Sequence, residues 1–187
     1  SSKGELHRMG FTTDMNELDI IYGREKKLGA AIRATYEKVK PKAIFVYATC
    51  VSGLIGEDIE AVCRKAEEDL SVRVIPVSAP GFVGPKNLGN RIAGEVLLDH
   101  VIGTGTAPLT SDYSINLIGE YNIAGDLYLT EPVLKRAGIN ILSHMTGNAT
   151  FEEITWAHKA KLNVVVCSRA LINVAKGMEQ KYGIPYV

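Results

Sequence analysis

The chain has 187 residues, 46% hydrophobic and 22% charged, a composition typical of a globular protein that can bury a sizeable core. Its 21 basic residues balance its 21 acidic residues, so the charge gives no reason to expect a nucleic acid or an anionic membrane as partner. No apolar run reaches the roughly 18 residues of a membrane-spanning helix, and Ser1–Gly4 lacks the apolar core of a signal peptide.

Strand-like and helix-like segments alternate along the chain. Short apolar runs rich in β-branched residues are typical of strands buried on both faces of a parallel sheet, and they occupy residues 43–48, 72–77, 115–118, 139–142 and 162–166. Helices are expected before, between and after them, at residues 26–39, 57–70, 88–101, 127–137, 151–159 and 170–182. This alternation predicts an α/β fold with Rossmann-like parallel sheets flanked by helices.

One segment rich in Gly, Thr, Ser and Pro, Gly103–Asp112, separates the first two expected strands from the last three. It predicts a first Rossmann-like unit over residues 1–104, a linker over residues 105–112 and a second unit over residues 113–187. The chain opens on polar residues and closes on Gly183–Val187, which resembles the start of a further strand. We therefore expect the first unit to be incomplete at its N-terminus and the second at its C-terminus.

Two of the three cysteines directly follow expected strands. In open α/β sheets, ligands bind beyond the carboxyl ends of the strands, where the thiolates of Cys50 and Cys167 could hold a soft metal or an iron–sulfur cluster. Free cysteines are more often packing residues, so the pattern alone favours a structural role for each, as it does for Cys63 within a helix. The odd number and wide spacing favour a reducing, cytoplasmic compartment over a disulfide framework.

The usual enzyme motifs are absent from the sequence. Gly103 and Gly105 are not followed by the third glycine of a dinucleotide-binding fingerprint, and there is no P-loop lysine, nucleophile elbow or Cys-x-x-Cys pair. None of the four histidines is paired at metal-ligand spacing. His144 ends an expected strand, where a partly buried, hydrogen-bonded histidine is a more frequent outcome than a ligand. A nucleotide-dependent Rossmann enzyme is therefore the weakest interpretation.

Four segments resemble the alpha-type subunits of nitrogenase component 1. They occur in the same order as in that family and span nearly the whole chain: Phe11–Gly23, Cys50–Glu60, Gly119–Asp126 and Lys161–Arg169. The resemblance implies the α/β fold of that family and a chain that forms part of a larger subunit.

The resemblance also assigns roles to individual residues. Cys50 matches a cysteine that helps to hold an iron–sulfur cluster at the boundary between the alpha- and beta-type subunits. Cys167 matches the cysteine that binds the terminal iron of the iron–molybdenum cofactor or its precursor. Ile123 matches an apolar wall of that pocket, and Arg169 a cationic residue whose guanidinium would offset the charge of an anionic cluster.

Several pocket positions depart from the dinitrogen-reducing subunits. Asn90 stands where those subunits carry a histidine associated with proton delivery, and an amide cannot act as an acid near neutral pH. Lys86 lies in the same loop, around a position where the reductase has a glutamine, and Ser168 replaces an aromatic residue. These changes keep the thiolate and remove the apparent proton relay, which implies an assembly scaffold in place of a catalytic subunit.

The resemblance therefore implies a scaffold, not itself an enzyme, on which the iron–molybdenum cofactor of nitrogenase is assembled. It implies a 4Fe-4S cluster and an iron–molybdenum cofactor precursor in the full-length complex, and none bound by these 187 residues alone. The implied partners are a beta-like N-type scaffold subunit in a heterotetramer, the nitrogenase iron protein and an upstream donor of iron–sulfur precursor. Two alternatives stay open: an alpha subunit of nitrogenase or a related reductase, and a metal-free Rossmann-like binding module.

Overall fold

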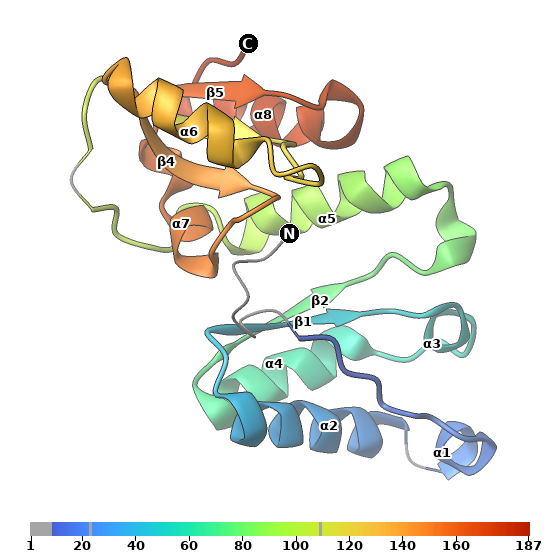
Figure 1. Ribbon diagram of the computed structural model, residues 1–187. Helices are drawn as coiled ribbons and strands as arrows, with labels where there is room; N and C mark the ends of the chain where they lie inside the picture. Colours follow the sequence, from blue (N-terminus) through green and yellow to red (C-terminus); the bar gives the residue numbers. More distant parts are fainter. Residues whose placement is uncertain (1–8, 23, 109) are drawn as a thin grey trace. The chain divides into compact units, whose positions relative to one another are not determined.

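Two compact units make up the chain, each built on its own parallel β-sheet (Figure 1). The computed structural model describes residues 9–22, 24–108 and 110–187. The first unit ends at Pro85, and the second extends from Lys86 to Val187. Helices flank both sheets, so the α/β fold class predicted from the alternating sequence pattern is confirmed.

The first unit contains a two-stranded sheet. Strands β1 (Ala43–Tyr47) and β2 (Arg73–Val77) run parallel and are paired in continuous register along their five residues. Its helical segments are α1 (Glu17–Tyr22), α2 (Arg24–Val39), α3 (Cys50–Leu54), α4 (Ile59–Leu70) and the 3-10 turn η1 (Gly81–Val83).

Helix α4 shows how local sequence sets these boundaries. The Asp58 carboxylate accepts a hydrogen bond from the Ala61 amide at 2.9 Å and begins the helix, and Ser71, in the left-handed conformation with φ of 53°, ends it. Ile59, Cys63 and Ala66 recur at intervals of three and four residues on its buried face. They pack into one core with Leu28, Ile32, Val72 and Val74.

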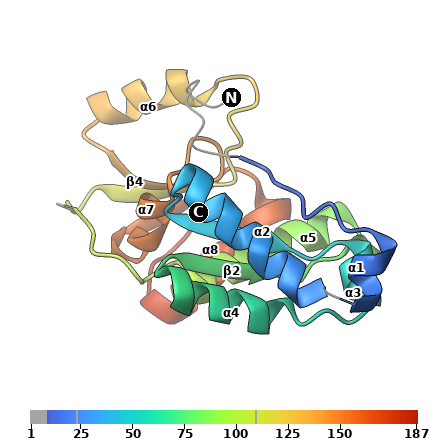
Figure 2. The ribbon, with the colours of Figure 1, turned by 90° about the horizontal axis from the view of Figure 1, so that it is seen from below.

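The second unit contains a three-stranded parallel sheet in the order β4-β3-β5. In Figure 2, strand β4 lies between helices α6 and α7. The end of the chain lies along the β5 edge of the sheet. The Asn163 amide donates to the Pro185 carbonyl at 2.9 Å, and the Val187 amide donates to the Asn163 carbonyl at 3.0 Å. The elements are α5 (Lys86–His100), β3 (Ser114–Ile118), α6 (Leu127–Arg136), β4 (Asn140–Met145), α7 (Phe151–Thr155), η2 (Ala157–Lys159), β5 (Leu162–Val165) and α8 (Ser168–Tyr182).

A pair of buried amides lies in the middle of this sheet. Asn116 of β3 is directly opposite Asn163 of β5 in the parallel register, and both side chains are fully buried. The Asn116 side-chain amide donates to the Asn163 side-chain oxygen at 2.8 Å and to the Ala157 carbonyl at 2.9 Å. The two side chains thus form a direct polar contact between β3 and β5 inside the sheet.

Helix α5 packs lengthwise on α8. A Cβ atom built on Gly94 would lie 2.6 Å from a methyl carbon of Val174, so the absence of a side chain lets the two helices approach closely. One turn further along α5 and two turns further along α8, the Lys181 ammonium donates to the Leu98 carbonyl at 3.2 Å. The contacts advance together along both helices, so α5 and α8 run in the same direction.

The position of α5 differs from the predicted division of the chain. The sequence predicted units over residues 1–104 and 113–187, which would assign α5 to the first unit, whereas the structure divides the chain after Pro85. The physical reason is that α5 packs against α8, with Gly94 in close contact with Val174 and Leu171. Residues 105–112, predicted as the linker, connect α5 to β3 within the second unit.

Candidate metal-cluster site

Cys50 is the third residue after the end of β1 and the first residue of α3, and it is exposed. The preceding Thr49 and the following Ser52 form a reciprocal cap. The Ser52 amide donates to the Thr49 hydroxyl at 3.2 Å, and the Thr49 amide donates to the Ser52 hydroxyl at 2.8 Å. The cap is complete without the Cys50 thiol, which is left accessible at the end of the strand as the sequence predicted.

The loop after β2 lies against the same thiol. A Cβ atom built on Gly81 would lie 3.0 Å from the Cys50 Sγ, and one on Gly53 would lie 3.0 Å from the side chains of Pro80 and Phe82. Any side chain at Gly81 would therefore compete for the space beside the sulfur. The two glycines allow the segments that follow β1 and β2 to approach each other closely beside Cys50.

Cys167 has a comparable position in the second unit. It follows β5 as the N-cap residue of α8, without a side-chain capping bond, and is partly exposed. Gly119, at the end of β3, has a φ of 81°, and a Cβ atom there would lie 3.0 Å from both the Cβ and the backbone nitrogen of Cys167. The positive end of the helix dipole favours negative charge at this position, as an anionic cluster would carry. The donor type and its setting therefore fit a cluster bound through one thiolate.

Two residues of the loop after β3, Tyr121 and Ile123, bear on the predicted pocket. Burial, together with an electrostatic interaction with the nearby Cys167, raises the pKa of the Tyr121 hydroxyl above its ordinary value. Sequence reasoning did not select Tyr121, although it lies in the segment that resembles the nitrogenase family. Ile123, predicted to be an apolar wall of the pocket, is 88% exposed, so its side chain is available to a ligand.

Lys86 and Asn90 lie one turn apart at the start of α5, with Lys86 exposed and Asn90 half-buried. Because α5 and α8 run in the same direction, with Gly94 beside Leu171 and Val174, this first turn lies towards the end of α8 that begins at Cys167. The predicted pocket residues of α5 thus belong to the same unit as the cofactor cysteine. Their contact with a cluster stays a prediction.

Arg169 falls in the first turn of α8, and its side chain lies outside the described part of the structure, as do those of Ser168 and Ala170. Cys63 is only 1% exposed, and burial, with the charges of Glu67 and Glu60, raises the pKa of its thiol to about 12. A thiol that is buried and protonated is a packing residue, as predicted. Among the described residues, no group of three or more His, Cys, Asp or Glu side chains is arranged to hold a metal ion.

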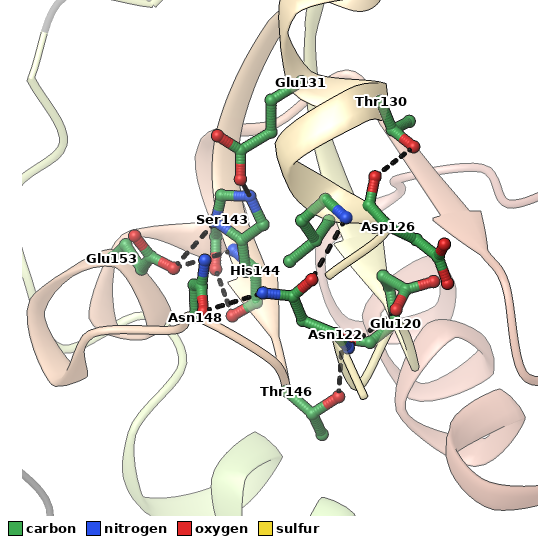
Figure 3. Close-up of polar contacts among 11 residues, drawn as sticks. Glu120, Asn122, Asp126, Thr130, Glu131, Ser143, His144, Thr146, Asn148 and Glu153 are labelled. Carbon is green, nitrogen blue, oxygen red and sulfur yellow. Dashed lines mark hydrogen bonds and ion pairs between the residues drawn. The ribbon is translucent and has the colours of Figure 1, made fainter. Parts of the chain in front are cut away.

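His144 is engaged by two carboxylates, Glu153 and Glu131 (Figure 3). Its Nδ1 lies 3.0 Å from Glu153 Oε1 and its Nε2 lies 3.3 Å from Glu131 Oε1. Its side chain is 14% exposed, which confirms the prediction of a partly buried, hydrogen-bonded histidine.

The fold and these two thiols define a class of protein. Each unit is a parallel α/β unit with an accessible cysteine beyond the carboxyl end of a strand. Such cysteines are suited to binding metal clusters. The family model "Nitrogenase component 1 type Oxidoreductase" matches residues 2–187. The chain belongs to this family.

Individual relatives agree with this assignment. The chain is 58% identical to "Nitrogenase iron-molybdenum cofactor biosynthesis protein NifE" of Nostoc sp. over 100% of its own length and 39% of the relative's. It is 46% identical to the protein of the same description from Klebsiella pneumoniae, and there it covers 43% of the relative. The solved structure "Nitrogenase Cp1 at pH 5" superposes with a TM-score of 0.91 at 43% identity, over 95% of this chain and 36% of that one. The chain thus spans about two fifths of the length of these relatives.

Helices long and apolar enough to cross a membrane were not found among the residues that the structure describes.

Proposed function

We propose that this chain is part of a cytoplasmic scaffold subunit on which the iron–molybdenum cofactor of nitrogenase is assembled. The observation that carries the proposal is the position of Cys167, an accessible thiol at the start of α8 against the side-chain-free Gly119. The identity of 46–58% to cofactor biosynthesis proteins, over the whole of this chain, supports the same function.

The cargo of the scaffold is an iron–sulfur precursor of the cofactor. Cys167 would supply one thiolate to it, Ile123 an apolar contact, and Arg169 and Lys86 positive charge to offset an anionic cluster. Asn90 would contact the cargo as a hydrogen-bonding side chain without a titratable proton near neutral pH. This set of side chains suits holding a precursor while iron, molybdenum and homocitrate are exchanged or inserted. It lacks an acid at Asn90, so we propose a carrier and not an enzyme.

Cys50 would serve a second, resident group. In the full-length subunit it would supply one ligand of a 4Fe-4S cluster shared with a beta-like N-type subunit, with further ligands from outside these residues. Such a cluster supplies electron transfer when bound. The proposal thus includes a heterotetramer with that subunit, electrons from the nitrogenase iron protein, and an upstream donor that delivers the iron–sulfur precursor.

Iron content and electron paramagnetic resonance of the full-length subunit, co-purified without oxygen with its beta-type partner, test the proposal. We expect Cys167→Ala to lose the iron and the signal of the larger cluster while the signal of the four-iron cluster persists. Cys63→Ala is the matched control, because it removes a cysteine that is buried within a helix. It should keep both signals. Equal iron in wild type and Cys167→Ala would remove Cys167 as the anchor.

The second candidate is an alpha subunit of nitrogenase or a related reductase, which the TM-score of 0.91 to a nitrogenase structure favours. Acetylene reduction by the intact complex would establish it in place of the scaffold, and Asn90 argues against it. If the anaerobic complex contains no iron at all, the chain is instead a metal-free binding module.

A further inference from the structure

Asn122 and Ile123 are neighbours in the loop between β3 and α6, yet their side chains lie at opposite extremes of exposure. Asn122 is fully buried, whereas Ile123 is 88% exposed. Asn122 also has a positive φ of 50°, a left-handed conformation that asparagine tolerates better than most residues. The chain therefore turns sharply at Asn122, with its amide inside the unit and Ile123 projecting outwards.

The buried amide joins three segments (Figure 3). Its nitrogen donates to the Asn148 side-chain oxygen at 3.2 Å, which ties the loop after β3 to the loop after β4. Its oxygen accepts a hydrogen bond from the Leu127 amide at 3.1 Å, at the first residue of α6. The backbone amide of Asn122 donates to the Glu120 carboxylate at 2.7 Å, which closes the turn locally. One side chain thus satisfies a helix-start amide and a neighbouring loop at once.

The same two loops are also joined by hydrogen bonds to backbone carbonyls. The Thr146 hydroxyl donates to the Glu120 carbonyl at 3.1 Å, and the Gly119 amide donates to the Met145 carbonyl at 2.7 Å. A Cβ atom on Gly147 would lie 2.5 Å from the Glu120 carbonyl oxygen, so the approach requires a glycine. The loop is therefore fixed at its start by backbone contacts and at its centre by Asn122.

This arrangement links the two predicted sides of the pocket. Gly119 contacts Cys167 at the start of the loop, and Ile123 lies four residues later. We propose that Asn122 is the positioning residue of the precursor site: its buried amide holds the loop so that Ile123 keeps one place relative to Cys167. This inference rests on the proposed scaffold function and extends it to a residue that does not touch the cargo itself.

The test compares wild type with Asn122→Gly and Asn122→Asp in the full-length complex purified without oxygen. Glycine accepts the positive φ and removes the amide, so the loop can form but is no longer held. We expect precursor retention to fall by about 10–100-fold, the range seen when supporting partners of a metal site are removed, with a broadened paramagnetic signal. Asn122→Asp keeps an oxygen for the Leu127 amide and should retain more of the precursor than Asn122→Gly.

Asn116→Ala is the matched control, because Asn116 is an equally buried asparagine of the same unit that bonds to Asn163 and Ala157. It should lower thermal stability without broadening the signal of the bound precursor. If retention in Asn122→Gly and Asn116→Ala falls in the same proportion to the lost stability, Asn122 is only structural and the proposal is overturned.

Amide hydrogen exchange on the cluster-free complex separates this proposal from the proposed function. We expect residues 119–126 to exchange faster in Asn122→Gly than in wild type, while the exchange of β5 stays unchanged. That result supports the positioning role of Asn122 even if the wild-type complex carries no precursor. Absence of the precursor would contradict only the proposed scaffold function. Unchanged exchange of residues 119–126 would overturn the positioning role of Asn122, whatever the iron content of the complex.

Discussion

His144 Nδ1 lies 3.0 Å from Glu153 Oε1 and forms the centre of a small ionic cluster on the sheet of the second unit. Glu131 approaches the other ring nitrogen, and Lys135, one turn further along α6, lines the same open groove as His144. Burial by itself would lower the pKa of His144, but the two carboxylates outweigh it and raise that pKa above its ordinary value of 6.5. The folded chain therefore binds the histidine proton more tightly than the unfolded chain does.

The first prediction concerns the pH dependence of stability. A raised pKa in the folded state contributes stability that is fully present below pH 6.5 and is lost as the pH rises through the folded pKa. His144→Gln should remove this contribution, lowering the free energy of unfolding by about 1 kcal/mol at acidic pH and less at alkaline pH. Urea unfolding at several pH values measures it.

Glu153→Gln provides the companion variant, because its amide oxygen can still accept the His144 backbone amide while the charge is lost. It should flatten the same pH profile. A wild-type slope that persists in both variants would show that the stability change arises from another group.

The second prediction concerns the contact between Gly119 and Cys167. Gly119 and Gly138 have nearly equal φ values, 81° and 79°, but only Gly119 has atoms of another residue within 4 Å of the added Cβ position. Gly138→Ala should therefore cost about 1 kcal/mol of stability, the conformational penalty alone. Gly119→Ala should cost about 1–3 kcal/mol more, because it also overpacks the backbone of Cys167. Equal losses in chemical unfolding would contradict the close approach.

The third prediction concerns the packing of α5 on α8. Gly94→Ala places a methyl group 2.6 Å from Val174, so we expect a loss of about 1–3 kcal/mol in the free energy of unfolding. Gly89→Ala, in the same helix with nothing within 4 Å of the new methyl group, should gain about 0.5–1 kcal/mol from helix propensity. Thermal unfolding of the two variants gives the sign. A gain in both would mean that the helices are further apart.

The fourth prediction concerns the reactivity of the three cysteines. Alkylation at neutral pH, followed by mass spectrometry, should modify the exposed Cys50 first and the partly exposed Cys167 second. Cys63 should remain unmodified, because it is 1% exposed and its pKa is raised to about 12. Unfolding in guanidinium chloride is the control and should make all three reactive. Labelling of Cys63 in the folded chain at the rate of Cys50 would contradict the packing of α4.

Local signals explain why much of the fold could be predicted from the sequence. The apolar runs identified the five strands of the described residues, and Cys50 and Cys167 could then be placed close to the ends of two of them. Gly138 follows α6 and has a φ of 79°, the left-handed conformation that a glycine just after a helix often adopts. These features depend on residues close together in sequence, which is where periodicity and turn chemistry carry information.

Features that depend on distant residues could not be predicted in the same way. The close contact between Gly94 and Val174 joins α5 to the second unit. These residues are far apart in the sequence, so no local pattern predicts the contact. Tyr121 and Asn122 are consecutive polar residues in a loop, and the sequence did not distinguish the one whose pKa responds to Cys167 from the one that is fully buried. Short helices such as α3, only five residues long, also escaped the periodicity argument.

The Asn116–Asn163 pair helps to specify the register of β5 against β3. A slip of β5 by one residue along β3 would place Asn116 opposite Leu162 or Val164 and leave two buried amides without each other. Each abandoned amide would cost about 1–3 kcal/mol, whereas an all-apolar layer would penalise the same slip less. The pair therefore favours one alignment over its neighbours while the sheet forms.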